Sequence, residues 1–141
     1  MKLKMKKIRF GYIAVVLLVI TTNCSKEKQT LLESVWVVNY LQEDANITNR
    51  IYFADIHSLS FIGDDKYVFQ TPEGDCIIGN VKIESNNKIR FERILTKFNN
   101  LFTDSFSCSL ENINCYEVDA DHLILRGNNG LKIGFMPKTI F

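Results

Sequence analysis

The chain has 141 residues, which suits one domain of ordinary size and is too short for two. Its 17 basic and 16 acidic residues give a formal net charge of +1. A nucleic-acid-binding protein usually carries a concentrated basic surface. This balance of charge therefore gives no reason to expect a nucleic-acid partner.

The N-terminus joins a basic segment to an apolar one. Five basic residues lie between positions 2 and 9, and an apolar run follows over residues 10–20. That run is about eleven residues long, short of the roughly 20 that a helix needs to cross a bilayer. A charged segment follows almost at once. The pattern is typical of a secretory signal.

The run ends in the stretch TTNC at residues 21–24. This stretch resembles the processing site of a bacterial lipoprotein signal. The resemblance implies that residues 1–23 are a signal peptide and that Cys24 becomes an acylated, palmitate-bearing first residue. The protein would then be lipid-anchored in the cell envelope, at the outer membrane. The alternative is a single-pass signal anchor in which Cys24 is a plain thiol.

Processing before Cys24 would change the character of the chain. The remaining 118 residues would carry 12 basic and 16 acidic side chains, a net charge of about −4. Residues 24–30 are polar and are predicted to form a tether, whose reach as a flexible chain is roughly 13 Å. Residues 31–141 are predicted to form one domain that works near the membrane.

The first predicted strands cover residues 31–41 and 56–70. Residues 31–41 (LLESVWVVNYL) are rich in β-branched and aromatic side chains, as in a buried or half-buried strand. Residues 56–70 (IHSLSFIGDDKYVFQ) alternate apolar and polar positions on both sides of Gly63-Asp64-Asp65. This alternation predicts a hairpin that turns at Gly63.

Two further strands are predicted over residues 76–85 and 88–94, with a turn at Asn86-Asn87. The alternating pattern then stops. Between residues 95 and 114, Phe98, Leu101, Phe102 and Phe106 fall at helical spacing. A short helix or ordered loop is expected around residues 97–106, with its aromatic side chains closing one end of the core.

Three short strands complete the chain. They are predicted around residues 116–118, 123–125 and 131–135, and the turn between the last two, Gly127-Asn128-Asn129-Gly130, is expected to be close to type I′. Seven to nine short strands in one chain indicate an all-β, mostly antiparallel meander. A barrel is favoured over a sandwich because closure removes the free edges of the sheet.

Several of these segments together resemble the META domain of heat-inducible and other envelope lipoproteins. They are the early tryptophan Trp36, the hairpin LSFIGDDKYVF, the block GDCIIGNVKIESNNKIRF and the ending YEVDADHLILRGNNGLKIGF. Gly74-Asp75-Cys76 stands where that family has Gly-Cys-Asn, and residues 105–108 (SFSC) stand where it has Thr-x-x-Ala-Cys. Small lipocalin-like bacterial lipoproteins are the second family that the chain resembles.

The cysteines predict one disulfide and one free thiol. With Cys24 acylated, three cysteines remain in an oxidising compartment, namely Cys76, Cys108 and Cys115. The family resemblance implies the pair Cys76–Cys108, which would stabilise the domain by about 3–4 kcal/mol through loop entropy. The local pair Cys108–Cys115 is the alternative.

No catalytic or metal site is expected, and no cofactor. His57 and His122 have no serine, cysteine or carboxylate at a diagnostic spacing. The acidic pairs Asp64-Asp65 and Asp119-x-Asp121 are better explained as turns than as a calcium site, which needs six or more oxygen ligands.

Two functions are therefore expected in order of preference. The first is a non-catalytic envelope lipoprotein that contacts a protein partner or supports the envelope under stress. The second is a binding module for a small apolar ligand held in the barrel. For the second, Trp36, Tyr67 and Tyr116 are the candidate ligand contacts, since an aromatic body with a polar tip suits a barrel mouth.

Overall fold

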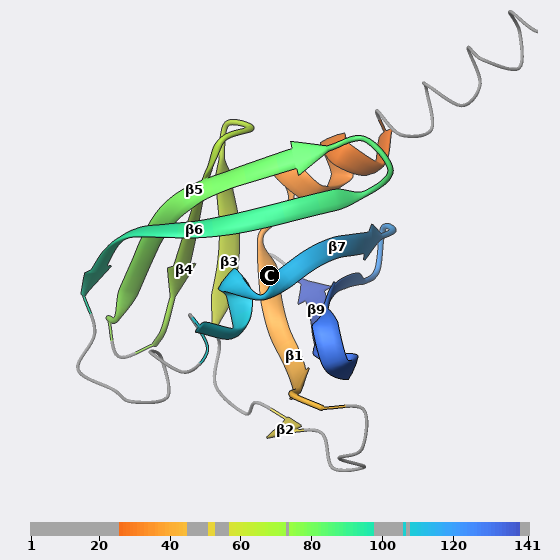
Figure 1. Ribbon diagram of the computed structural model, residues 1–141. Helices are drawn as coiled ribbons and strands as arrows, with labels where there is room; N and C mark the ends of the chain where they lie inside the picture. The colour runs from red at the N-terminus through yellow and green to blue at the C-terminus, as the bar shows by residue number, and fades with distance from the viewer. Residues whose placement is uncertain are drawn as a thin grey trace, which may run out of the picture.

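The computed structural model describes residues 26–44, 51–52, 57–72, 74–97, 106 and 108–138. Its nine strands are β1 (Trp36–Gln42), β2 (Ile51–Tyr52), β3 (Ser58–Ile62), β4 (Lys66–Gln70), β5 (Cys76–Glu84), β6 (Lys88–Lys97), β7 (Ile113–Val118), β8 (Leu123–Gly127) and β9 (Lys132–Pro137). All pairings are antiparallel, and β1 pairs with β9 as well as with β2 and β3. Eight strands thus close into a barrel, with β2 as a short extension (Figure 1). The predicted all-β, mostly antiparallel barrel is confirmed.

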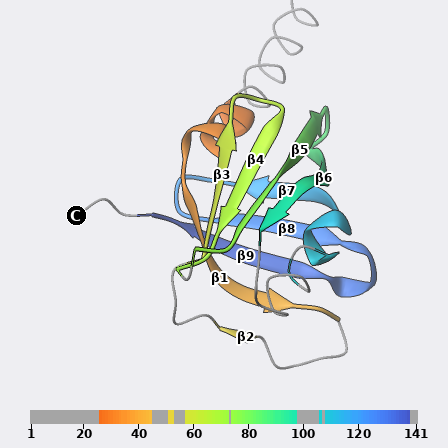
Figure 2. The ribbon, with the colours of Figure 1, turned by 90° about the vertical axis from the view of Figure 1, so that its left-hand side faces the viewer.

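Strand β1 closes the barrel because it pairs with other strands along both of its edges. Its first two residues pair with β3, and its end pairs with β2, while its other side pairs with β9 along nearly its whole length. The register with β9 shifts by one residue between Val38 and Tyr40. Such a bulge increases the twist and bends the strand, as closure requires. Figure 2 shows β7, β8 and β9 crossing the direction of β3, β4 and β5 on the opposite side of the barrel.

The barrel interior is filled by its own side chains. Alternate residues of the strands point inward, as Tyr67 and Phe69 do on β4, where both are fully buried. Twenty hydrophobic residues of the described ranges form one buried cluster. Its largest members include Trp36, Phe106 and Phe135, also on inward-facing positions. A barrel of about eight strands is narrow enough for side chains alone to fill it.

The turns follow the glycine and asparagine positions. Gly63 has φ of +65° in the β3–β4 hairpin, and Asn86 and Asn87 have φ of 60° and 57° between β5 and β6. Positive φ at both central residues is the type I′ pattern. The turn between β8 and β9 is different, because Asn128–Gly130 form a short 3-10 turn with Asn129 at φ 59°. The type I′ geometry expected there is found at Asn86-Asn87 instead.

Residues 26–33 are helical, although residues 24–30 were expected to form a tether and residues 31–33 to begin a strand. The helix is held at its end by packing. Leu31 is fully buried, and the indole Nε1 of Trp36 donates a 3.0 Å hydrogen bond to the Leu31 carbonyl. An isolated helix of eight residues is marginal in water, so this tertiary contact explains why the polar sequence is ordered. Cys24 and the signal segment 1–23 lie outside the described residues.

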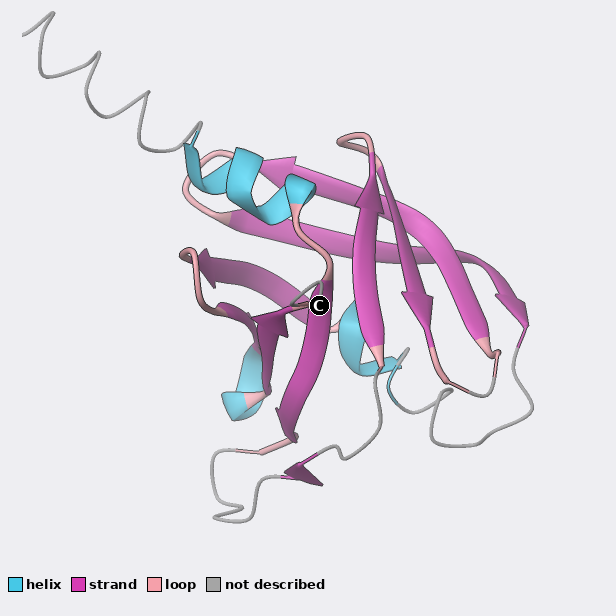
Figure 3. Cartoon of the chain, turned by 180° about the vertical axis from the view of Figure 1, so that it is seen from behind, coloured by secondary structure: helices cyan, strands magenta, loops and turns pink. Residues whose placement is uncertain are grey.

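A second helical segment is described at Phe106 and at residues 108–111. Strand β6 extends to Lys97, Phe106 is helical within the predicted range 97–106, and residues 98–105 of that range lie outside the described residues. Phe106 is fully buried and stacks on Phe69 with ring centroids 4.4 Å apart. It therefore closes one end of the core as expected, against Phe69 of β4. Figure 3 shows the helical segments in cyan among the magenta strands. Phe98, Leu101 and Phe102 lie outside the described residues, and no helix in the described ranges is both long and apolar enough to span a membrane.

Candidate functional site

One sparsely paired seam of the barrel lies between β6 and β7. Strands β5 and β6 pair at nine positions, whereas β6 and β7 pair at one, Lys88 with Cys115. One further backbone hydrogen bond, 2.9 Å long, runs from the Tyr116 N–H to the Asn87 carbonyl. Beyond this point the two strands diverge, as Figure 1 shows. The seam therefore leaves most of the facing edges of β6 and β7 without strand pairing among the described residues.

Side chains of the helical segment cover the inner part of the seam. Arg93 of β6 and Glu111 form an ion pair with 3.7 Å between Nε and Oε1, and both are only partly exposed. Leu110 is fully buried beside Phe106 in the same segment. These contacts replace the missing strand pairs on the core side. The outer side of the seam stays open.

The open side forms a cleft of about 420 Å³, which we term the seam cleft. Its floor includes Ile89 and Ile113, both buried. Its polar walls come from outward-facing positions of three strands, namely Lys82, Glu84, Lys88, Arg90, Asn114 and Cys115. This volume is within the range of small-molecule sites, although the cleft is open to solvent on its outer side.

The seam cleft is basic. Lys82 pairs directly across the hairpin with Arg90, and Glu84 pairs with Lys88. Lys82 also forms an ion pair of 3.2 Å with Glu84. Within the described part of the chain, neither Lys88 nor Arg90 has a carboxylate at ion-pair distance. Three cations and one anion therefore leave a local charge of about +2.

The N-terminal helix lies at the same end of the barrel as the cleft. A smaller pocket of about 210 Å³ is lined by Lys28 of the helix together with Glu84, Asn86 and Asn87 of the β5–β6 turn. Glu84 and Asn86 also line the seam cleft. Figures 1 and 2 both show the helix and the β5–β6 turn at one end of the molecule. The cleft thus lies close to the point where residues 1–25 join the domain.

The three candidate ligand contacts are core residues. Trp36 and Tyr67 are fully buried and Tyr116 is 3% exposed, so none of them stands at an open barrel mouth. The indole N–H of Trp36 already donates a hydrogen bond to the Leu31 carbonyl. The packing role that such residues usually have accounts for all three positions. A ligand would reach them only from inside the barrel.

Tyr67 has a feature that packing does not explain. Its hydroxyl is the one buried side-chain polar atom without a hydrogen-bond partner among the described residues. Burial raises the pKa of this phenol to about 12, with the Glu111 carboxylate acting in the same direction and Arg93 against it. The ring lies against Gly79 and packs edge-on to Phe91 at 5.0 Å. The phenol is therefore neutral at physiological pH, and it donates to no group among the described residues.

The structure contains three free thiols among the described residues, so the predicted disulfide is absent. Cys76 begins β5 and Cys115 pairs beside Lys88, at the other end of the β5–β6 hairpin. Eight residues of strand separate these ends by about 26 Å, so Cys76 and Cys115 cannot pair with each other. The predicted pair Cys76–Cys108 and its alternative Cys108–Cys115 are also not formed. Cys108 is exposed on the helical segment, whereas Cys115 is half-buried, with its Sγ 4.0 Å from the Arg126 carbonyl.

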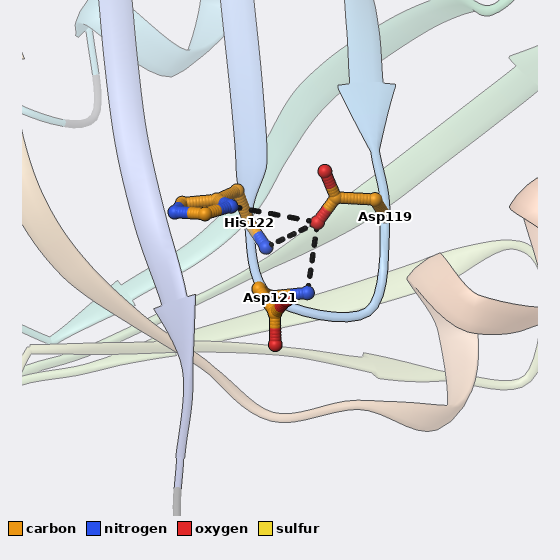
Figure 4. A network of polar contacts seen from close by, with 3 residues as sticks. All are labelled: Asp119, Asp121 and His122. Carbon is orange, nitrogen blue, oxygen red and sulfur yellow. Dashed lines mark hydrogen bonds and ion pairs between the residues drawn. The ribbon is translucent and has the colours of Figure 1, made fainter.

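The histidines and acidic pairs occupy turns and packing positions. Oδ1 of Asp119 accepts 2.8 Å hydrogen bonds from the backbone N–H groups of Asp121 and His122, and the His122 ring lies 3.5 Å away (Figure 4). These N–H donors lower the pKa of Asp119 below its ordinary value. His57 is 8% exposed, immediately before β3, and stacks on Phe69. No three metal-ligating side chains gather anywhere in the described residues.

The fold thus defines a small, closed, antiparallel β-barrel with a filled interior and a polar cleft at one seam. No family model and no curated sequence matches the chain. Among solved structures, it is similar to a DUF4847 family protein from Bacteroides vulgatus ATCC 8482, with a TM-score of 0.65, 16% identity, and coverage of 81% of this chain and 99% of that one. A protein from Burkholderia xenovorans solved by NMR gives 0.60 at 13% identity, covering 82% and 88%. At such identities the likeness concerns the fold alone, and the META and lipocalin-like resemblances stay predictions.

The seam cleft was not found by sequence reasoning. Lys88 and Arg90 lie in the predicted strand 88–94, at exposed positions that line the cleft. The further signal was the Lys82-x-Glu84 stretch facing Lys88-x-Arg90 across the Asn86-Asn87 turn. The observed register leaves three residues, 85–87, between the paired Glu84 and Lys88 and so places Lys82 opposite Arg90. A two-residue turn at Asn86-Asn87 would have shifted this pairing by one residue, so the basic pair could not be predicted from the turn alone. The position of β7 beside this pair also could not be predicted from the sequence.

Proposed function

We propose that the protein is a non-catalytic, lipid-anchored protein of the cell envelope that works through contacts on its outer surface. Cys24 is the proposed lipid site, and the domain that follows is held close to the bilayer. The observation that carries the proposal is the filled interior. Aromatic side chains stack through the core, as Phe106 does on Phe69. A barrel packed in this way offers its surface, rather than a calyx, to a partner.

The order of residues 26–33 supports a short distance between anchor and barrel. With a helix starting by residue 26, only Ser25 separates Cys24 from an ordered element. Eight helical residues extend about 12 Å. The barrel would thus lie against the headgroup region rather than hang from a long flexible tether. A partner in or near the same membrane is the expected contact.

A second candidate is a small ligand held within the barrel, and the Tyr67 hydroxyl favours it. Buried polar groups in proteins almost always have a partner. A bound molecule with an acceptor oxygen near this phenol would supply one. Such a ligand would have to displace or occupy space among the core side chains that surround Tyr67.

Intact-mass measurement tests both candidates. The protein is extracted gently from its own membranes and weighed under native and then denaturing conditions. The anchored reading predicts a denatured mass for residues from Cys24 onward with acyl chains added, and a native mass without ligand. A denatured mass that includes Met1 would refute processing at Cys24. Extra mass present only in the native spectrum would replace the surface reading with the ligand reading.

A further inference from the structure

We propose that the seam cleft binds the phosphate group of an anionic ligand, with Lys82, Lys88 and Arg90 as its cationic contacts. The proposal deepens the surface role given above and rests on it for one source of the phosphate, the headgroup of a neighbouring lipid. A soluble phosphate compound is the other source. The chemistry of recognition is the same for both.

The arrangement of charge is the first argument. Lys82 and Arg90 are direct cross-strand neighbours on the outer face of the hairpin. Like charges in this position repel each other and destabilise a sheet. Glu84 forms an ion pair with Lys82 at 3.2 Å and stands opposite Lys88, whereas Arg90 has no carboxylate at ion-pair distance among the described residues. An anion bound between the strands would relieve the repulsion, which makes an anionic ligand the natural complement of this surface.

The contrast with the whole domain strengthens this argument. If residues 1–23 are removed, the remaining chain has a net charge of about −4. A local charge of about +2 therefore stands out against an acidic background. The negative charge of the domain as a whole would repel anions, so binding of an anion would depend on the local positive charge of the cleft.

The dimensions favour a compact group. The cations border a single cleft of about 420 Å³ rather than a strip along the barrel. A phosphate concentrates its charge on a few oxygens, each of which accepts charge-assisted hydrogen bonds from lysine and arginine. A long acidic peptide would need cations spaced along its length. Asn114 adds an amide side chain at the wall of the same cleft.

The location of the cleft makes lipid headgroups accessible. Glu84 and Asn86 line both the cleft and the pocket that Lys28 of the N-terminal helix borders. If Cys24 is acylated, the membrane lies within about one short helix of this end of the barrel. Headgroup phosphates would be present there at high local concentration.

Cys115 provides a reporter inside the cleft. It is a half-buried free thiol that lines the cleft, whereas Cys108 is a free thiol exposed on the helical segment and outside the cleft lining. The full-length protein in a non-ionic detergent is treated with iodoacetamide, and alkylation of each cysteine is followed by peptide mass spectrometry. Reactions contain inorganic pyrophosphate, phosphatidylglycerol in mixed micelles, phosphatidylcholine in mixed micelles, or a glutamate-rich peptide.

A phosphate ligand is expected to slow alkylation of Cys115 by about threefold or more, because thiol reactivity depends on access. Cys108 should react at an unchanged rate. Protection by pyrophosphate would support a soluble ligand, and protection by phosphatidylglycerol alone would support a lipid headgroup. Protection by the acidic peptide alone, or by none of the additives, would overturn the proposal. The pyrophosphate result does not depend on acylation of Cys24, so a protein without lipid can still pass this test.

The double variant Lys88→Gln/Arg90→Gln identifies the binding groups. Both side chains are exposed, so the fold should be kept. The concentration of pyrophosphate or phosphatidylglycerol that gives half-maximal protection should rise on the order of tenfold or more, since hydrogen bonds to charged groups are the strong ones. Lys66→Gln removes an exposed charge from β4, outside the cleft, and is the control. Equal protection in the double variant and in the control would refute the assignment.

Discussion

Replacing Tyr67 with phenylalanine should stabilise the protein. The hydroxyl is buried and has no partner among the described residues. A buried group left unsatisfied costs about 1–3 kcal/mol. Phenylalanine keeps the ring in its place against Gly79 and edge-on to Phe91, at 5.0 Å. The free energy of unfolding should therefore increase by about 1–2 kcal/mol.

Urea denaturation of the wild-type protein and the variant measures this change. An increase of that size would raise the melting temperature by about 3–8 °C for a domain of this length. Tyr116→Phe is the matched control, since Tyr116 is also a buried core tyrosine, but its hydroxyl is not among the buried atoms that lack a partner. It should show no gain. Destabilisation of Tyr67→Phe by 1 kcal/mol or more, at about the hydrogen-bond scale, would refute the reasoning and show that water or a ligand satisfies the phenol.

The same substitution should change the response to alkaline pH. Burial raises the pKa of Tyr67 from 10.0 to about 12 in the folded protein. The folded state thus keeps a proton that the unfolded chain releases above pH 10, and the free energy of unfolding falls as pH rises through this window. The phenylalanine variant lacks this loss. Its advantage over the wild-type protein should widen above pH 10, and a constant difference would contradict the burial of the phenol.

Three further changes test other parts of the fold. Gly79→Ala would place a Cβ 2.4 Å from the ring of Tyr67 and closer still to the backbone of β6, so it should lower the free energy of unfolding by about 2 kcal/mol or more in urea denaturation; an unchanged midpoint would contradict this packing. Trp36→Phe removes the hydrogen bond to Leu31, and amide exchange in the N-terminal helix should speed up by about tenfold, equivalent to roughly 1.4 kcal/mol, whereas unchanged exchange would show that the helix is held otherwise. The pKa of Asp119 is lowered in the folded protein, so the wild-type protein loses stability as the pH falls below 3.8. The Asp119→Ala variant should lose less stability over the same pH range. Thermal unfolding at neutral and acid pH measures both losses, and equal losses would show that the turn does not stabilise the carboxylate.

Local hairpins were the most predictable part of this fold. The turn at Gly63 and the turn at Asn86-Asn87 both require positive φ, and the residues at those positions adopt it at low cost. The apolar alternation on either side then fixed the inward faces of β3 to β6. These features depend on residues close together in the chain, so one sequence suffices to find them.

Contacts between distant segments were not predictable in the same way. The N-terminal helix is ordered by the contact of Leu31 with Trp36, and its polar residues alone indicated a tether. The predicted Cys76–Cys108 disulfide and its alternative Cys108–Cys115 do not form, and Cys108 lies exposed on the helical segment. Each of these outcomes depends on register across the closed barrel.

The basic residues of the seam cleft have a second possible role, the protection of unpaired strand edges. The sign of the charge that each role requires distinguishes the two. Strand edges that lack partners invite pairing with other chains, and lysines or other charges on such edges prevent it. Lys88 and Arg90 stand at the divergence of β6 and β7, where this protection is needed. Edge protection requires charge of either sign, whereas phosphate binding requires positive charge. The variant Lys88→Glu/Arg90→Glu should therefore remain soluble under both explanations, while loss of phosphate protection at Cys115 is expected only if the cleft binds phosphate.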